Sequence, residues 1–236
     1  VTGSKDNLTF MAYKKYVDLR GKEMMDERAL FSSSTNKADS NMHEAKYTKL
    51  NTELNSYRDS IINAQPNALM GVLLSAMKES PLPTKVAVTH EDSLENYQYY
   101  KKHYWDGITF MDDRVVRTPF FLPKLERYYR EVMVQQADTI IKDLDYKLLL
   151  ARTAPEMYKF LLNWATDEYI NPKYMGHDKI FVHLFEKYHS KGLSPWLNEK
   201  QMETITRRAY MQMANLIGEK AADLEMIDST GKPTSL

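Results

Sequence analysis

The sequence predicts an all-α protein: a multi-helix bundle or irregular α-superhelix of about nine helices, with a short β-hairpin at its C-terminal end. Three observations predict this fold. Apolar residues recur at three- and four-residue spacing along most of the 236 residues. Glycine and proline are few, with 8 and 9 copies, and stand between the periodic segments. Helix-capping residues precede several of those segments.

The N-terminal part predicts three helices. Apolar residues at every seventh position predict the first over residues 8–32, and small polar residues end it near 32–36; the apolar residues are Phe10, Val17, Met24 and Phe31. A three-and-four stripe predicts the second helix, which ends before Pro66 because a residue that precedes proline disfavours helix. Its members are Tyr47, Leu50, Leu54, Tyr57 and Ile61. Residues 69–77 are expected to form a short third helix.

Cap signals place the helices that follow. Thr89 with Asp92 predicts a capping box, and Thr118 before Pro119 predicts a helix start. Residues 108–114 between them lack a helical period and are expected to form a loop. Further stripes predict helices over about 137–151, 157–164, 180–188 and 198–216. The second of these is expected to begin with a capping box of Thr153 and Glu156. The last is expected to restart at Asn198 to Gln201 after Ser194 and Pro195.

The composition excludes several classes of function. Lys and Arg together number 32, as do Asp and Glu, so the chain lacks the concentrated positive charge that nucleic acids or anionic membranes require. No stretch approaches the roughly 20 apolar residues of a membrane span. Cysteine is absent, which excludes disulfides, thiolate metal sites and cysteine nucleophiles within these residues.

The pattern changes from helical to strand-like at residue 217. Residues 224–227 alternate in part like a strand, and residues 228–232 predict a hairpin turn. This segment resembles the opening hairpin of thioredoxin-like domains of the TlpA and peroxiredoxin type. The matching positions are Gly218, Ala221, Asp223, Asp228, Gly231 and Lys232, whereas Ala222 stands where those domains usually have proline. The expected organisation is a helical domain over 1–216 and the start of a thioredoxin-like domain over 217–236.

The helical part carries a second resemblance, through residues 103–108, 113–119 and 123–126. It is similar to a helical domain of unknown function from Bacteroidetes that precedes a thioredoxin-like domain in exported proteins. The resemblance covers most of residues 8–216. It implies a periplasmic or membrane-anchored parent protein whose redox Cys-x-x-Cys motif lies beyond Leu236. No catalytic residue can be transferred from it to this chain.

Two groups of residues are candidates for binding. The densest aromatic patch contains Tyr99, Tyr104 and Trp105, whose rings could line a groove for a glycan or a peptide. The three-and-four spacing of Tyr97, Tyr100 and Tyr104 favours core packing instead, and Tyr99 lies off that face. Asp112 and Arg114 follow the patch; Asp112 with Asp113 could act as an acid–base pair, although a salt-bridged loop is the simpler interpretation.

The histidines give a weak indication of a metal site. Glu186 and His189 have the Glu-x-x-His spacing of di-iron helical bundles. A second copy of that motif is missing, and His183 and His189 point about 120° apart on a helix. We therefore expect no metal, no cofactor and no catalytic residue in this chain.

Two hypotheses of function remain. The first is a non-catalytic helical spacer or interaction domain of an exported thiol–disulfide protein, with another protein or the adjacent thioredoxin-like domain as its partner. The second is a ligand-binding helical domain whose aromatic groove holds a glycan or a peptide.

Overall fold

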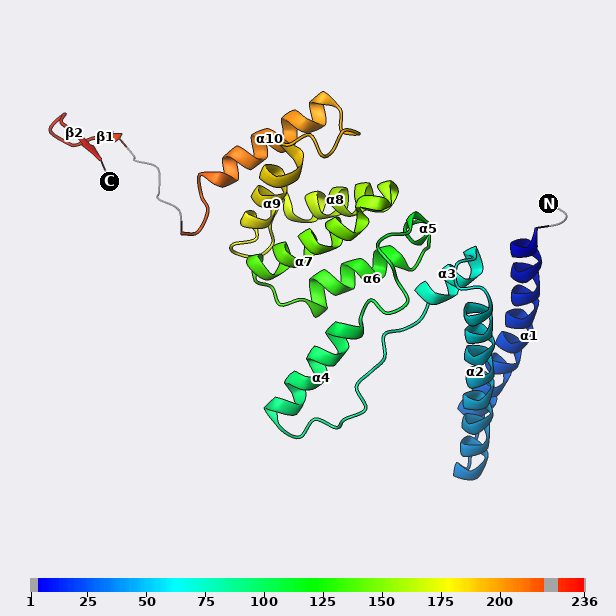
Figure 1. Cartoon of the computed structure of the whole chain (residues 1–236). Coiled ribbons are helices and arrows are strands. Elements are labelled where there is room, and N and C mark those ends of the chain that lie inside the picture. Colours follow the sequence, from blue (N-terminus) through cyan, green and yellow to red (C-terminus); the bar gives the residue numbers. More distant parts are fainter. Residues whose placement is uncertain (1–3, 219–224, 236) are drawn as a thin grey trace. The chain divides into compact units, whose positions relative to one another are not determined.

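The computed structural model describes residues 4–218 and 225–235, and within these ranges the chain forms ten α-helices and one two-stranded sheet (Figure 1). The all-α class is confirmed. The chain divides into two compact units, one made of residues 1–109 with 117–121 and the other of 110–116 with 122–236. No helix among the described residues has the length and apolarity needed to cross a bilayer.

The first unit contains a long antiparallel hairpin of α1 (Lys5–Ser33) and α2 (Lys37–Ala64), which lie side by side (Figure 1). The turn between them ends at Asn36, whose side chain accepts the Asp39 backbone N–H at 2.8 Å and so caps α2. No described residue of α1 is fully buried, because α2 covers one side of that helix and much of the rest faces solvent.

The core of this unit lies where α3 (Leu69–Ala76) packs against the end of the hairpin. Ile61, Met70 and Leu74 are its buried members, and Tyr13 and Tyr57 pack on them. α4 (His90–His103) begins with the predicted capping box: the Thr89 hydroxyl accepts from the Asp92 backbone, and the Asp92 carboxylate accepts from Thr89.

Gly107 follows the end of α4 and packs against the C-terminal end of α3. Gly107 has φ +83°, and a Cβ on it would lie 2.3 Å from the Ser75 carbonyl oxygen. Only glycine satisfies both the left-handed backbone and this close approach. The turn at Asp106 and Gly107 is therefore also a contact with the end of α3.

The second unit is a helical bundle with a mainly apolar centre that also buries a few polar side chains, among them Lys147 and His189. Its elements are α5 (Asp113–Val116), α6 (Phe121–Arg127, within the unit from Leu122 on), the π-turn η1 (Tyr128–Val132), α7 (Ala137–Leu150), the 3₁₀ turn η2 (Ala151–Thr153), α8 (Pro155–Tyr169), α9 (Asp178–Leu184), the π-turn η3 (Phe185–His189) and α10 (Glu199–Met213). The most buried side chains come from five of these helices: Leu125, Ile140, Leu144, Met157, Leu161, Phe181 and Ala209. α10 begins where the sequence predicted a helix restart, and Asn198 and Gln201 form a capping box there.

Two predicted helix starts were wrong. α6 begins at Phe121 rather than directly after Thr118, because residues 117–120 form a turn in which Thr118 is buried. Thr153 and Glu156 do not form a capping box: Thr153 lies in η2, and Ala154 is the residue before α8. The expected loop over residues 108–114 is shorter than predicted, because Asp113 and Arg114 belong to α5.

The C-terminal sheet pairs β1 (Glu225–Ile227) with β2 (Pro233–Ser235) antiparallel, with Met226 opposite Thr234. The Asp228 carboxylate accepts the backbone N–H groups of Thr230 and Lys232 in the turn. Gly231 has φ +81° there, as a turn of this kind requires. The predicted hairpin is thus present, whereas the matching positions Ala221 and Asp223, and the departing Ala222, lie outside the described residues.

Candidate binding site on the helical hairpin

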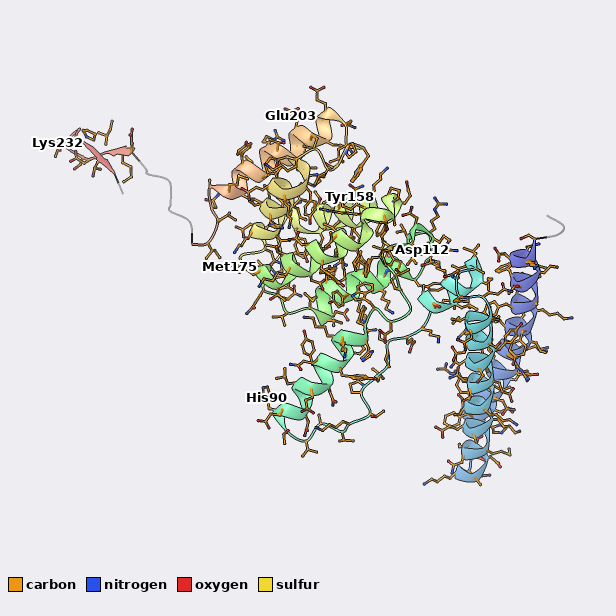
Figure 2. The ribbon with its side chains drawn as sticks, viewed as in Figure 1. His90, Asp112, Tyr158, Met175, Glu203 and Lys232 are labelled. Carbon is orange, nitrogen blue, oxygen red and sulfur yellow. The ribbon has the colours of Figure 1, made fainter. Side chains whose placement is uncertain are left out.

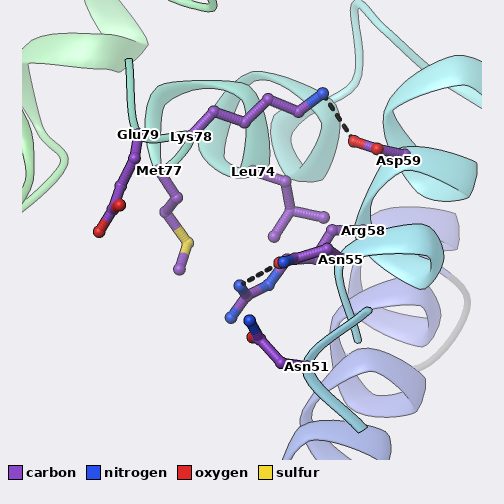
Figure 3. Close-up of a pocket in the computed structure, with 8 residues that line it drawn as sticks. All are labelled: Asn51, Asn55, Arg58, Asp59, Leu74, Met77, Lys78 and Glu79. Carbon is purple, nitrogen blue, oxygen red and sulfur yellow. Dashed lines mark hydrogen bonds and ion pairs between the residues drawn. The ribbon is translucent and has the colours of Figure 1, made fainter. Parts of the chain in front are cut away.

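A polar cavity lies within the first unit, beside the point where α2 meets the end of α3 (Figure 3). It measures about 460 Å³. Side chains from one face of α2 and from the C-terminal end of α3 line it: Asn51, Asn55, Arg58, Asp59, Leu74, Met77, Lys78 and Glu79. Ligand sites are usually lined mostly by apolar side chains with a few placed polar groups, and this cavity has a more polar lining than that.

The helical period places the polar residues of α2 together. Asn51, Asn55 and Arg58 are separated by four and three residues, so their side chains project from one face of the helix. That face adjoins the buried stripe of Leu54 and Ile61, which turns toward the core. The same packing that buries the apolar stripe therefore directs this polar row into the cavity.

Two neighbours fix the guanidinium of Arg58. Its Nε donates to the Tyr13 hydroxyl at 3.1 Å, and its Nη1 donates to Asn55 Oδ1 at 3.2 Å. Within the described residues, no ion pair joins Arg58 to a carboxylate. The cavity therefore holds an oriented positive charge, neutralised by no carboxylate of the described chain.

The remaining lining is apolar at the floor and charged at the rim. Leu74 forms the floor and is 1% exposed, and the half-buried Met77 lies beside it. At one end, the Lys78 ammonium lies 2.6 Å from the Asp59 carboxylate across the gap between α3 and α2. Figure 3 shows the Arg58 guanidinium pointing into the cavity, toward the side where Met77 and Glu79 lie.

The aromatic residues predicted from the sequence lie elsewhere in the first unit. Tyr104 is 2% exposed and packs edge-on against Tyr100 and Trp105, with centroids 5.6 and 5.2 Å apart. Trp105 in turn contacts Phe121 at 6.3 Å. Tyr99 is 42% exposed and contacts His103 with the two rings tilted by 41° and their centroids 4.5 Å apart. The structure thus brings Tyr104 and Trp105 together as packed rings and leaves Tyr99 at the surface; binding through them stays a prediction.

Asp112 and Arg114 lie in the second unit, directly before and within α5; Asp112 is labelled in Figure 2. The Arg114 guanidinium donates to both oxygens of Asp112, with Nε at 2.9 Å from Oδ1 and Nη2 at 2.6 Å from Oδ2. This pairing lowers the pKa of Asp112 below its usual range. Asp113 accepts the Met157 backbone N–H instead. The two adjacent carboxylates therefore serve separate structural contacts.

The histidines bind to separate partners as well. His183 Nε2 lies 3.0 Å from Asp145, which also receives the Lys187 ammonium and the Tyr188 hydroxyl. His177 lies 3.3 Å from the Gln135 carbonyl oxygen. No group of three metal-ligating side chains occurs within the ranges that the structure describes.

A second cavity, of about 400 Å³, lies in the second unit between α8 and the start of α10 and reaches His189. The Thr166 hydroxyl donates to the Leu162 carbonyl, so His189 Nε2 donates to Thr166 and its Nδ1 accepts from Ser194, both at 2.8 Å. Burial lowers the pKa of His189 to about 4. Both ring nitrogens are paired within the protein, and Thr166, His189 and Ser194 are all buried.

Residues of the α2–α3 cavity were not found from the sequence. A signal was present, since Asn51, Asn55 and Arg58 keep three-and-four spacing next to the apolar stripe. Polar residues at that spacing are common on solvated helix faces, and only the position of α3 turns this row into a cavity wall.

Comparison with known proteins identifies a family. The family described as Domain of unknown function (DUF5106) matches residues 32–215. No curated protein matches the chain, and no solved structure matches it.

Proposed function

The chain belongs to that family, whose region spans most of the helices, and we propose that it is a non-catalytic helical interaction domain of an exported thioredoxin-like protein. In this role the helices recognise a partner and position a thiol–disulfide domain whose paired cysteines follow Leu236. The family description states no function, so the proposal rests on the chain's own geometry and on the resemblance of its C-terminal hairpin.

The observation that carries the proposal is the sheet formed by β1 and β2. It consists of two three-residue strands, and within the described residues no third strand pairs with it. Ile227 is largely exposed on it. Isolated two-stranded hairpins are marginally stable in water. Such a hairpin is therefore best explained as part of a sheet that more of the protein completes, as the resemblance implies.

The interaction role is supported by the first unit. The α1–α2 hairpin exposes large apolar side chains on α1, namely Leu8, Met11, Leu19, Met25 and Leu30. Beside it lies the cavity around Arg58, which combines a fixed cation, two amides and an apolar floor. A periplasmic or membrane-anchored location belongs to the same proposal.

Removing residues 217–236 tests the domain boundary. If the hairpin belongs to a neighbouring domain, a 1–216 variant should unfold in urea with a free energy within about 0.5 kcal/mol of the 1–236 chain. A loss of several kcal/mol would show that the hairpin is part of the helical fold, and the assignment to a second domain would be wrong.

A ligand-binding domain remains the second candidate because of Tyr99. Its ring is exposed beside His103, and an exposed aromatic ring can pack against a sugar or a peptide side chain. A thermal-shift screen of glycans and peptides with the Tyr99→Ala variant tests it. A ligand that raises the melting temperature of the wild type but not of the variant would favour this candidate.

A further inference from the structure

We propose that the α2–α3 cavity binds an extended peptide segment and recognises a carboxylate on it through Arg58. This inference deepens the proposed interaction role and rests on it. Three features of the cavity carry it: the spacing of Asn51 and Asn55, the unneutralised guanidinium of Arg58, and the apolar floor of Leu74 and Met77.

The spacing of the two asparagines matches a peptide main chain. Four residues of α-helix rise about 6 Å, whereas groups on one edge of an extended peptide repeat every two residues, about 6.6–6.8 Å. Asn51 and Asn55 are four residues apart, and each amide both donates and accepts. The two side chains can therefore pair with successive N–H and C=O groups along one edge of a peptide.

Arg58 supplies the charge recognition. Nε and one N–H of Nη1 are held by Tyr13 and Asn55, so the other three of the five guanidinium N–H groups have no hydrogen-bond partner among the described residues. The planar fork suits the two oxygens of a carboxylate. Because its neighbours already orient the group, little side-chain entropy is lost when a ligand binds.

The other lining residues select the rest of the ligand. The half-buried Met77, beside the buried Leu74, offers an apolar surface for one side chain. The Lys78 and Asp59 side chains neutralise one another at one end. Glu79 adds a negative charge at the other side of the cavity, which disfavours a ligand with a second carboxylate there. The preferred ligand is thus an apolar peptide with one carboxylate, either at its C-terminus or on an acidic side chain.

Fluorescence anisotropy with the 1–236 chain tests this. The probes are a labelled leucine–glycine pentapeptide with a free C-terminus, its C-terminally amidated form, and an amidated form that contains one glutamate. We expect at least one carboxylate peptide to bind about tenfold more tightly than the uncharged amide. Whether the C-terminal or the glutamate peptide binds identifies the source of the carboxylate. Inorganic phosphate at millimolar concentration should compete weakly.

Matched variants test whether the preference for carboxylate peptides depends on the cavity. Arg58→Gln should reduce the carboxylate preference to within twofold, and Asn51→Ala should weaken all probes. Lys49→Gln removes the same charge from an exposed position of α2 and should change nothing. If Arg58→Gln lowers the helical circular dichroism, Arg58→Lys replaces it, since lysine keeps the charge but not the fork.

Several results would overturn the inference: no binding of any probe at millimolar concentration, equal binding of the amidated and carboxylate peptides, or equal losses in the Arg58 and Lys49 variants. Phosphate that binds more tightly than every peptide would indicate an anion site instead. None of these results bears on the assignment of residues 217–236 to a thioredoxin-like domain, so failure here is separate from failure of the proposed function.

Discussion

The carboxylate of Asp113 accepts the backbone N–H of Met157 at 2.9 Å, and this contact caps α8 from a different helix. Pro155 is the first residue of α8 and has no N–H, so Met157 carries one of the unpaired donors of the first turn. Asp113 begins α5. The bond therefore joins two residues that are 44 positions apart in the chain.

Loss of this cap should destabilise the second unit. We expect Asp113→Ala to lower the free energy of unfolding in urea by about 1 kcal/mol, because the N–H of Met157 loses its acceptor and the helix N-terminus loses a nearby negative charge. Thr153→Ala is the matched control, since Thr153 is the cap that the sequence suggested. It should change stability by less than about 0.5 kcal/mol. A larger loss in the Thr153 variant than in the Asp113 variant would contradict the assignment.

The buried lysine of α7 should depend on its acidic partner. Lys147 is 4% exposed, pairs with Asp143 and lies 4.5 Å from the Tyr128 ring centroid. Asp143→Ala leaves that ammonium buried without its partner, and we expect it to cost about 3 kcal/mol or more. Asp143→Leu combined with Lys147→Met should cost less than Asp143→Ala alone. Urea denaturation measures the free energy of unfolding of both variants. Equal losses of stability in the two variants would show that an unpaired Lys147 ammonium is not the cause of the destabilisation.

His189 should make the stability depend on pH. Its pKa is about 4 in the folded protein because of burial, against about 6.5 in an unfolded chain. Between these values the unfolded state binds a proton that the folded state does not. The free energy of unfolding should therefore fall by up to about 3 kcal/mol as the pH drops from 6.5 to 4, with no contribution above that window. His189→Gln should flatten this part of the profile, whereas the exposed His90→Gln should leave it unchanged. An unaltered slope in the His189 variant would refute the prediction.

Two glycines with similar backbone angles should differ in their tolerance of alanine. Gly107 has φ +83° and lies against the Ser75 carbonyl, whereas Gly192 has φ +71° and open space around it. Gly192→Ala should cost only the left-handed strain, about 1 kcal/mol. Gly107→Ala adds a clash with main chain that has no flexible end to move, so it should cost more. Thermal unfolding compares them; equal shifts in melting temperature would mean that the contact at Ser75 relaxes freely.

Local sequence signals predicted most of the fold. The capping boxes at Thr89 and Asn198 depend on residues three positions apart, so they are visible in the sequence and are present in the structure. The start of α8 was mispredicted because its cap, Asp113, comes from a distant segment. The π-turns at Tyr128–Val132 and Phe185–His189 were not predicted either, since their apolar residues fit an ordinary helical stripe.

The candidate site was predicted less well than the fold, because it depends on how distant segments pack together. The spacing of Tyr104 indicated a packed ring, and its side chain is buried. Asp112 and Arg114 were expected to form a salt-bridged loop, and they do. The cavity around Arg58 depends on where α3 docks against α2. No periodicity within α2 specifies that position, so an ordinary solvated face and a cavity wall have the same pattern.

The most direct test of the central claim is an insulin-reduction assay of the complete gene product beside the 1–236 chain, both with dithiothreitol as the electron source. The 1–236 chain contains no cysteine, so it should show no activity above the uncatalysed rate. The complete product should accelerate insulin precipitation through the paired cysteines beyond Leu236. An inactive complete product, or one without a paired-cysteine domain, would contradict the account.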